Sequence, residues 1–523
     1  MPAPGVDPRT PVVIGVGQSS ERVSDPGYRR LSPVGLAADA ARAAFADTGA
    51  DPVAVARAVD TVAGVRQFEI SNPRARAPLG RSDNYPRSVA RRVGVFPARA
   101  VLEVSGGQAP QHLVNELAGT IAAGHCEAVL IFGSEAISTV RHLGASADRP
   151  DFSETVEGEL EDRGYGLEGL LTPEQIRHGL VDAPAHYGLL ENARRVRLAQ
   201  SRGEYARGMG QLFAPFTEVA AANPHAAAPI ARTADELITV SERNRMIADP
   251  YPRFLVSRDQ VNQGAAVVLV SLAVAERLGV PPERRVFLHG HADLRERSFL
   301  ERPDLSAYPA GVLAVRHALD MAGLVMADVS TIDLYSCFPI AVSAVADGVG
   351  LAADDPRGLT VTGGLPFFGG AGNNYSAHAV AETVQRLRAD PGAYGLVGAN
   401  GGFLSKYSVG VYSTTPALWR PGDSRRVQAR LDSVPARPTS SRPQGGATVE
   451  TWTVEYGPGG ARKGTLVGRL DGDGRRFLAH ADDTDGELLD LLSAGDPAGE
   501  RIHVRSAPSG NRASLQQHSV NAR

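Results

Sequence analysis

The feature that most constrains the fold is an alternation of strand and helix patterns that occurs twice along the chain. Between residues 11 and 136, the strand patterns PVVIGVGQ, RAVLEVSGG and EAVLIFGSEA alternate with two helix patterns, the first of them opened by Ser32 and Pro33. From about residue 284 the same order returns, with predicted strands at RRVFLHGHA, DVSTIDLYS, GLTVTGG, AYGLVGANGG and SVGVYST. Helical crossovers join parallel neighbours, so the pattern predicts an α/β protein with a parallel or mixed sheet, built from two similar halves.

The 523 residues exceed one ordinary core, so we expect several units. A charged insertion of short helices interrupts the repeat, and Thr172 with Gln175 predicts a capping box inside it. Such insertions usually shape a binding cleft. The predicted boundaries are residues 1–136 with 264–283 for the first half, 137–263 for the insertion, 284–416 for the second half, 417–446 for a linker or wrapping arm, 447–507 for a small β-barrel-like unit and 508–523 for a disordered tail.

Composition excludes several function classes. The formal net charge is −4, and no Lys/Arg run alternates with aromatic residues, so nucleic acid is not an expected partner. The longest apolar run, 264–275, is too short to span a bilayer, and the first residues lack a leader pattern, so we expect a cytoplasmic protein. The two cysteines, Cys126 and Cys337, lie far apart, as in a reducing compartment with free thiols.

The stretch TGGLPFFGGAGNNYSAHAV, residues 362–380, is the most unusual local pattern. Its glycines and asparagines permit positive φ and close approach of the backbone to a ligand, and Asn374 or Ser376 can cap the following helix. His378 falls in the first turn of that helix, where the dipole favours the neutral imidazole. The pattern therefore predicts a histidine able to act as a base.

Four stretches together resemble the thiolase superfamily. They are SGGQAPQHLVNELAGTIAAGHCEAVLIFGSEA, FLVSRDQVNQGAAVVLVSLAVAERLGV, DLYSCFP and the glycine-rich stretch, which lie in order within residues 11–416. The similarity is strongest to sterol-carrier-protein-type thiolases and to bacterial acetyl-CoA acetyltransferase-like proteins with an extra C-terminal β domain. It implies a duplicated five-layer αβαβα fold with a helical loop insertion, usually dimeric, that handles coenzyme A thioesters.

The resemblance also implies where the family's acid–base residues should stand. Val104 occupies the position of the nucleophilic cysteine, Gly370 and Ala371 that of the GHP histidine, and Ala399 that of the second cysteine. In DLYSCFP, Tyr335 and Ser336 replace the family's His and Asp, whereas Cys337 and Phe338 are retained. Thiolysis and Claisen condensation are therefore disfavoured.

One hypothesis is a rebuilt catalytic pair, in which His378 takes the proton of Cys337 and the thiolate accepts an acyl group. The alternatives are a ligand-lining role without covalent chemistry and a purely structural role. The residues expected to hold the oxyanion or substrate are Ser105, Gly106, Gly107, Tyr335, Ser336, Gly369, Gly370, Asn373, Asn374, Asn400, Gly401 and Gly402.

Other candidate site residues have weaker support from the sequence. His289 and His291 share a strand face, but without a third ligand an ordinary half-buried pair is favoured over a metal site. Cys126 is expected to be inert. Lys406 and Tyr407 could approach a thioester carbonyl or a pantetheine arm, although a solvated loop lysine is the commoner case. Neither GxxxxGK[ST] nor GxGxxG after a strand is present, so nucleotide hydrolysis and dinucleotide redox chemistry are not supported.

These observations favour a thiolase-like acyltransferase acting on CoA-type acyl thioesters. The alternatives are a noncatalytic protein that binds acyl-CoA or a protein partner, and a subunit of a hetero-oligomer. We expect no permanently bound cofactor, with coenzyme A as substrate or ligand. A homodimer is expected, and the C-terminal β domain is a possible surface for a protein partner.

Overall fold

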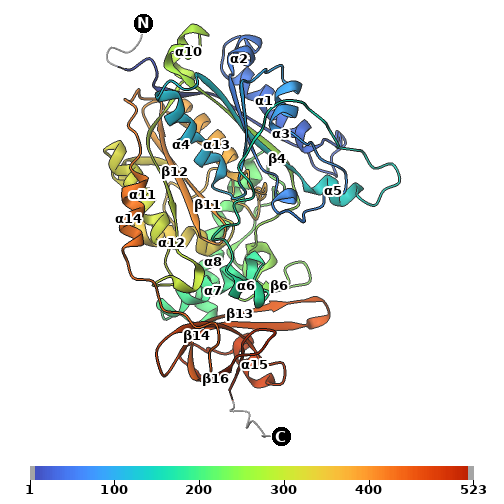
Figure 1. Ribbon diagram of the computed structural model, residues 1–523, viewed down its shortest axis with the longest axis vertical. Coiled ribbons are helices and arrows are strands. Elements are labelled where there is room, and N and C mark those ends of the chain that lie inside the picture. Colours follow the sequence, from blue (N-terminus) through green and yellow to red (C-terminus); the bar gives the residue numbers. More distant parts are fainter. Residues whose placement is uncertain (1–5, 516–523) are drawn as a thin grey trace.

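A large mixed sheet organises the chain, whose computed structural model describes residues 6–515 (Figure 1). Its ten strands have the order β10-β11-β12-β9-β1-β8-β4-β2-β3-β5. The strands are β1 (Pro11–Ser20), β2 (Thr61–Val65), β3 (Arg99–Glu103), β4 (Ala128–Ala136), β5 (Glu161–Asp162), β8 (Asn262–Ser271), β9 (Val286–Arg295), β10 (Val329–Leu334), β11 (Tyr394–Gly401) and β12 (Lys406–Ser413). Most residues of these strands are buried, and β2, β4, β8 and β12 are buried along their whole length, as expected for a sheet covered on both faces.

The strand order repeats between the two halves, which confirms the predicted duplication. The first half has the order β1-β8-β4-β2-β3, and the second half has the order β9-β12-β11-β10. In each half, the strand that comes first along the chain lies beside the last one, which is followed across the sheet by the last but one and then by the second. The corresponding pairs β2–β4 and β10–β11 are both parallel, whereas β8 and β12 run antiparallel to their neighbours. The halves join where β1 pairs antiparallel with β9 at Val12 and Val13.

Helices cover both faces and also separate the two half-sheets. Helices α4 (Ala109–Ala122) and α13 (Tyr375–Ala389) contact each other and strands of both halves. Helices α1 (Pro33–Asp47) and α3 (Tyr85–Arg92) cover the outer face of the first half, and α11 (Pro309–Ala322) and α12 (Pro339–Val349) that of the second. The result is the predicted five-layer αβαβα arrangement. Short helices α2 (Pro52–Ala58) and α10 (Leu272–Arg277) lie at its edges.

The middle of the insertion between β4 and β8, residues 173–252, lies between the core and the C-terminal unit (Figure 1), whereas β5 within the insertion belongs to the large sheet. Its capping box is confirmed, since the Thr172 hydroxyl accepts from the Gln175 backbone N–H and the Gln175 side chain accepts from Thr172. Its elements are α5 (Ile137–Leu143), α6 (Pro173–Arg177), α7 (Ala183–Arg197), α8 (Arg202–Ala222), α9 (Ala234–Ile238), β6 (Met246–Ala248) and β7 (Tyr251–Pro252).

The C-terminal unit is a closed five-stranded barrel with its own core around Trp452, Leu466 and Phe477. The strands are β13 (Gly445–Tyr456), β14 (Arg462–Leu470), β15 (Arg476–Ala481), β16 (Arg501–Arg505) and β17 (Arg512–Ser514), and α15 (Gly486–Ala494) packs against them. Strand β13 pairs with both β14 and β16, which closes the barrel. It also pairs with β6 of the insertion, so the barrel is joined to the insertion through its backbone.

Three predictions need correction or refinement. GLTVTGG is not a strand, because the Val361 N–H and the Thr360 hydroxyl donate to the Asp333 carboxylate instead of to a sheet neighbour. Residues 508–515 are not a disordered tail, since they include β17 and the fully buried Asn511; residues 516–523 lie outside the described part. Within 417–446, helix α14 (Ser424–Asp432) packs on α11 and β9, as a wrapping arm would.

In the part of the chain that the structure describes, no helix is both long and apolar enough to cross a membrane.

Candidate functional site

A cavity of about 1130 Å³ lies where the loops of both halves meet the insertion and the barrel. Nine of the predicted site residues line it, namely Ser105, Gly106, Gly107, Tyr335, Cys337, Gly370, Asn373, Asn400 and Gly402. Five are not among the lining residues, namely Ser336, Gly369, Asn374, His378 and Gly401. The structure therefore brings loops that are more than 200 residues apart into one site.

Side chains of the glycine-rich stretch fasten the two halves together at the cavity floor. The Gly106 N–H donates to Asn373 Oδ1 at 2.9 Å, and the Ser376 hydroxyl donates to the Gly107 carbonyl at 2.8 Å. Asn374 does not cap α13 as expected, because its amide donates to the Gly133 carbonyl at 2.8 Å. Asn373, Asn374 and Ser376 therefore hold loops of the two halves together. Because the Gly106 N–H already donates to Asn373, it has no free hydrogen to donate to an oxyanion.

Two glycines are required by close contacts at the floor. A Cβ on Gly107 would lie 2.2 Å from the Tyr335 hydroxyl oxygen, and one on Gly401 would lie 1.7 Å from Gln108 Oε1. Neither distance is tolerable, so a side chain at either position would displace the Tyr335 ring or the Gln108 amide. The two glycines thus leave room for the side chains of Tyr335 and Gln108 to pack against the backbone here.

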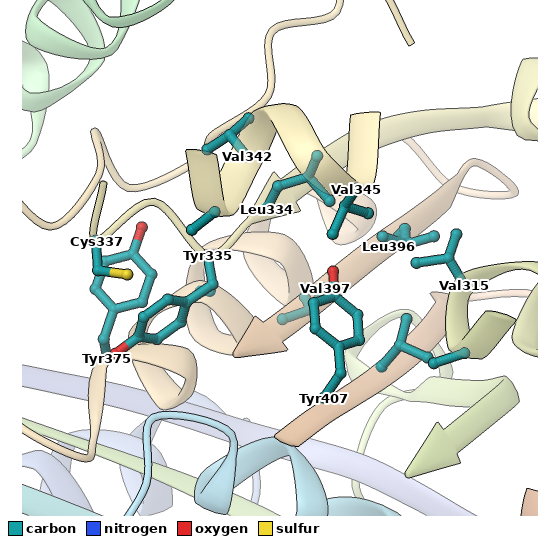
Figure 2. Packing of buried hydrophobic residues seen from close by; sticks show 14 of the residues in the cluster. Val315, Leu334, Tyr335, Cys337, Val342, Val345, Tyr375, Leu396, Val397 and Tyr407 are labelled. Carbon is teal, nitrogen blue, oxygen red and sulfur yellow. The ribbon is translucent and has the colours of Figure 1, made fainter. Parts of the chain in front are cut away.

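Cys337 follows β10 and lies beside Tyr335, with Tyr375 next to it, as Figure 2 shows. Its sulfur accepts a weak hydrogen bond from Asn400 Nδ2 at 3.9 Å. Asn400 Nδ2 also donates to the Tyr187 hydroxyl at 2.9 Å, and that hydroxyl donates to the Gly402 carbonyl at 3.0 Å. Burial raises the pKa of the Cys337 thiol to about 12, although hydrogen bonds from Tyr187, Phe338 and Asn400 oppose this. The sulfur is therefore a neutral thiol near pH 7.

The structure does not bring His378 to Cys337. His378 is fully buried, its Nδ1 bonds Gln18 Oε1 of β1 at 2.7 Å, and its ring packs edge-on against Phe368. The neutral form is favoured, as predicted, but burial is the main cause of a pKa lowered to about 3. His378 therefore does not line the cavity that Cys337 lines, because its side chain bonds Gln18 of β1 instead.

Two other polar side chains at the cavity could meet a ligand. The buried Ser105 hydroxyl lines the cavity and has no hydrogen-bond partner among the described residues. Lys406 is also buried there and donates to the Gly166 carbonyl at 2.8 Å; burial and Arg295 lower its pKa. Unsatisfied buried donors are uncommon in folded proteins, so the Ser105 hydroxyl is a candidate donor to a ligand atom in the cavity.

The insertion contributes site residues that sequence reasoning missed. Tyr187 of α7 contacts Asn400, and Glu191, one turn later, is fully buried and accepts from the Tyr251 hydroxyl and the Ile340 N–H, both at 2.7 Å. Glu191 thereby fixes the start of α12 just after Cys337. Nothing in the helical pattern of α7 distinguishes these inward residues from ordinary core positions.

A cluster of potential metal ligands lies outside the cavity. Oxygen and nitrogen atoms of Glu103, His112 and Glu116 lie within 4.8 Å of one another. Arg163 already bridges the two carboxylates at 2.6 Å, and Asp293 with Glu116 raises the pKa of His112 to about 10. A protonated imidazole and a guanidinium make this an ion-pair network rather than a metal site.

The remaining candidates have ordinary partners. His289 and His291 each bond a backbone carbonyl, of Thr415 and Arg420, and His291 stacks on Trp419. Cys126 is buried, and burial raises its pKa to about 11.

The fold and the loops around the cavity define a thiolase-like α/β protein with an appended barrel. A family model for the thiolase-like protein type 1 additional C-terminal domain matches residues 426–508, beginning within the predicted linker. No curated protein sequence matches the chain.

Solved structures extend the similarity to the whole chain. A monomeric SCP2-thiolase-like protein type 1 from Mycobacterium smegmatis is 50% identical, covers 98% of this chain and 100% of its own, and has a TM-score of 0.85. The chain therefore belongs to the SCP2-thiolase-like protein type 1 family. The dimeric peroxisomal thiolase of Saccharomyces cerevisiae (15% identity, 78% of this chain and 98% of its own, TM-score 0.56) shares the fold. So does an Ltp2-ChsH2(DUF35) aldolase (18% identity, 79% and 100%, TM-score 0.57).

Proposed function

We propose that the cavity binds an acyl thioester of the coenzyme A type and holds it without forming an acyl-enzyme. The observation that carries this proposal is a large cavity with an unpartnered Ser105 hydroxyl beside the loops that resemble thiolase catalytic loops. A hydroxyl there can donate to the thioester carbonyl, which is the polar atom that such a ligand must present.

The cavity wall suits an alkyl or ring-bearing acyl group. Its apolar lining residues include Leu167, Leu170, Val181, Ile230, Phe254 and Phe403. At about 1130 Å³, the cavity exceeds the ~300–1,000 Å³ of most small-molecule sites. Each buried methylene stabilises a complex by about 0.8 kcal/mol, so a large acyl group would bind better than acetyl.

Acid–base arguments favour binding over covalent catalysis. With a pKa of about 12, the Cys337 thiol is ionised in only about one molecule in 10⁵ at pH 7. His378, the nearest predicted base in sequence, bonds Gln18 instead.

Calorimetric titration with acyl-CoAs of increasing chain length tests the proposal, together with an assay for free coenzyme A. We expect binding that strengthens with chain length and no release of free coenzyme A. Ser105→Ala should weaken binding by about tenfold, since it removes one hydrogen bond to the ligand. Ser433→Ala, on an exposed hydroxyl outside the cavity, is the matched control. An absence of binding for every acyl-CoA would end the proposal.

A second candidate function is acyl transfer through Cys337, favoured by the position of its sulfur at the cavity. The sulfur would attack the thioester carbon, the bond to the coenzyme A sulfur would break, and the thiol proton would pass to the departing thiolate. Mass spectrometry of the intact protein after incubation with acyl-CoA tests this step. An unmodified Cys337 beside full turnover would exclude it.

We further propose that the chain is a monomer, rather than the homodimer expected from the family resemblance. Support comes from the Mycobacterium smegmatis relative, which is described as monomeric. Light scattering should give a mass near 55 kDa at all concentrations. A concentration-dependent mass near twice that value would instead support the homodimer. The similarity to a two-component aldolase keeps a separate protein partner as the alternative assembly.

A further inference from the structure

A glycine-rich segment of the insertion covers one side of the cavity. We call residues 164–171 the lid; it runs from the end of β5 toward the start of α6, and two of its leucines line the cavity. Gly164, Gly166 and Gly169 adopt positive φ angles of 77°, 65° and 70°. Residues with a Cβ disfavour these angles, so the glycines permit the path that the lid takes over the core.

Three successive carbonyls of the lid accept hydrogen bonds from the core. The donors and acceptors are Arg66 Nε with the Gly164 carbonyl at 3.1 Å, the Ser105 N–H with the Tyr165 carbonyl at 3.3 Å, and Lys406 Nζ with the Gly166 carbonyl at 2.8 Å. Ser105 and Lys406 also line the cavity. The lid therefore occupies two donors that could otherwise serve a ligand.

The backbone of the lid lies directly against the residue before Ser105. A Cβ on Gly166 would lie 2.7 Å from Val104 Cβ and 3.2 Å from Lys406 Nζ, so a side chain there would push the lid away. Val104 stands where the resemblance to thiolases places the nucleophilic cysteine. The lid therefore covers that position, and a ligand carbonyl can replace the lid carbonyls on both donors only if the lid moves.

The lid itself is held less firmly than the segments on either side of it. None of its residues is buried. Arg163, immediately before the lid, forms ion pairs with Glu103 and Glu116, both at 2.6 Å. Immediately after it, the capping box of Thr172 fixes the start of α6. A segment with few buried contacts between two fixed ends can open at a lower free energy than the rest of the fold.

We propose that the lid closes over a carbonyl-binding site formed by the Ser105 N–H and the Lys406 ammonium, and that an acyl thioester displaces the lid by presenting its own carbonyl oxygens to these donors. The inference rests on the proposed function, to which it adds a closed state. In that state the carbonyls of Tyr165 and Gly166 take the place of the ligand's. The apparent affinity is then reduced in proportion to the fraction of molecules whose lid is open.

Weakening the lid tests the inference, because a gain in affinity is expected. Gly164→Ala combined with Gly169→Ala, the lid variant, places side chains at two positive φ angles. Beyond the adjacent residues, neither Cβ would meet a heavy atom of the described part of the chain within 4 Å, so the substitutions act through strain, which favours the open lid. In calorimetric titration, the lid variant should bind decanoyl-CoA about fivefold more tightly than the native chain.

The matched control is Gly94→Ala combined with Gly279→Ala. These glycines have φ angles of 74° and 70°, and a Cβ on either would be equally free of contacts with the described residues. Neither belongs to the lid or lines the cavity. The control should therefore carry the same strain and bind decanoyl-CoA with native affinity.

A double-mutant cycle tests whether Lys406 serves the lid and the ligand in turn. Lys406→Met keeps a long side chain and removes the donor. In the native chain it weakens both the closed lid and the bound ligand, so the two effects partly cancel. In the lid variant only the loss to the ligand remains. We expect the substitution to weaken decanoyl-CoA binding about tenfold in the lid variant and less than about threefold in the native chain. Equal losses in the two proteins would contradict the shared use of Lys406.

Hydrogen exchange of the native chain gives a test without substitutions. With saturating decanoyl-CoA, amides of the lid should exchange faster, because the ligand has displaced it, while residues 105–107 become protected. A lid that is a fixed part of the cavity wall would instead keep or gain protection, and that result would overturn the inference.

Failure of the inference is distinguishable from failure of the proposed function. If decanoyl-CoA binds the native chain, the lid variant and the control with equal affinity, the lid is a fixed wall and the proposed function stands. If no acyl-CoA binds any of these proteins, the proposed function itself is wrong, and the inference falls with it.

Discussion

At the scale of single residues, the cavity thiol should be unusually unreactive. Burial raises the pKa of Cys337 to about 12 and that of Cys126 to about 11, so we expect slow labelling of both by a thiol reagent at pH 8. Relative to a free cysteine of pKa ~8.5, the thiolate fraction of Cys337 is lower by about 10³. The rate should rise about tenfold per pH unit below pH 12.

A colorimetric thiol assay followed by mass spectrometry checks this. The denatured chain should react promptly at both cysteines. Fast labelling of native Cys337 at pH 7 would contradict the assigned pKa and would revive covalent chemistry.

The buried carboxyl of Asp333 should impose a pH dependence on stability. Burial raises its pKa to about 7, although donors from Val361 and Thr360 oppose the shift. The unfolded value is ~3.9, so the native state holds more protons between pH 4 and 7, and stability falls as pH rises through that window. Three pKa units correspond to about 4 kcal/mol, which is an upper bound for one group.

Asp333→Asn should abolish this contribution, because an amide can accept the same two hydrogen bonds without ionising. The stability of the variant relative to the native chain should increase between pH 4 and pH 7 and remain constant above. Urea unfolding across pH measures it. Parallel pH profiles for the two proteins would refute the assignment.

Single residues also show where sequence reasoning reaches its limit. Asn373 and the cavity-lining glycines Gly106, Gly107, Gly370 and Gly402 were predictable as residues near the cavity, because runs of Gly and Asn favour tight turns that can approach a ligand. His378 was placed on the correct helix, but the direction of its ring depends on Gln18, 360 positions away. Tyr187 and Arg245 come from an insertion whose path over the core leaves no local signal.

At the scale of elements, one buried arginine contributes to the joint between the barrel and the core. Arg476 of β15 donates to the Leu300 carbonyl at 2.9 Å and forms an ion pair with Glu450 at 2.7 Å. Its side chain is only 1% exposed. Removing one partner of a buried pair typically costs about 3–5 kcal/mol, so Arg476→Ala should loosen the barrel.

Differential scanning calorimetry and limited proteolysis measure this effect. Arg469→Ala is the matched control, because Arg469 also faces Glu450 but is 51% exposed and should contribute less than about 1 kcal/mol. An Arg476→Ala protein with native stability would show that the joint depends on other contacts.

Elements were predicted well where apolar periodicity and length agree, as in the strands of both halves and in α4 and α13. GLTVTGG failed because its β-branched composition suits a strand, yet the Asp333 side chain takes the hydrogen bonds that a neighbouring strand would. Strand β17 was missed because a three-residue strand in a polar segment has no periodicity; it depends on Asn511, whose amide donates to the Leu478 carbonyl.

At the scale of the whole molecule, ligand binding should stabilise four segments that are far apart in the sequence. The segments that line the cavity include the 105–107 loop, the insertion, the loops after β10 and β11, and the end of β13. A ligand that binds only the native state stabilises it by about 2.7 kcal/mol at one hundred times its Kd. Because the wall includes the barrel, this stabilisation should reach barrel and core together.

Hydrogen exchange with and without saturating acyl-CoA measures this coupling. Protection should increase in residues 105–107, in 228–260 and in 455–457 within one experiment, because all three segments contribute lining residues and a ligand that fills the cavity restrains them together. Helix α2 and strand β16 do not line the cavity and serve as internal references. Protection confined to 105–107 would mean that the ligand contacts only that loop, and that the barrel does not contribute to the binding site.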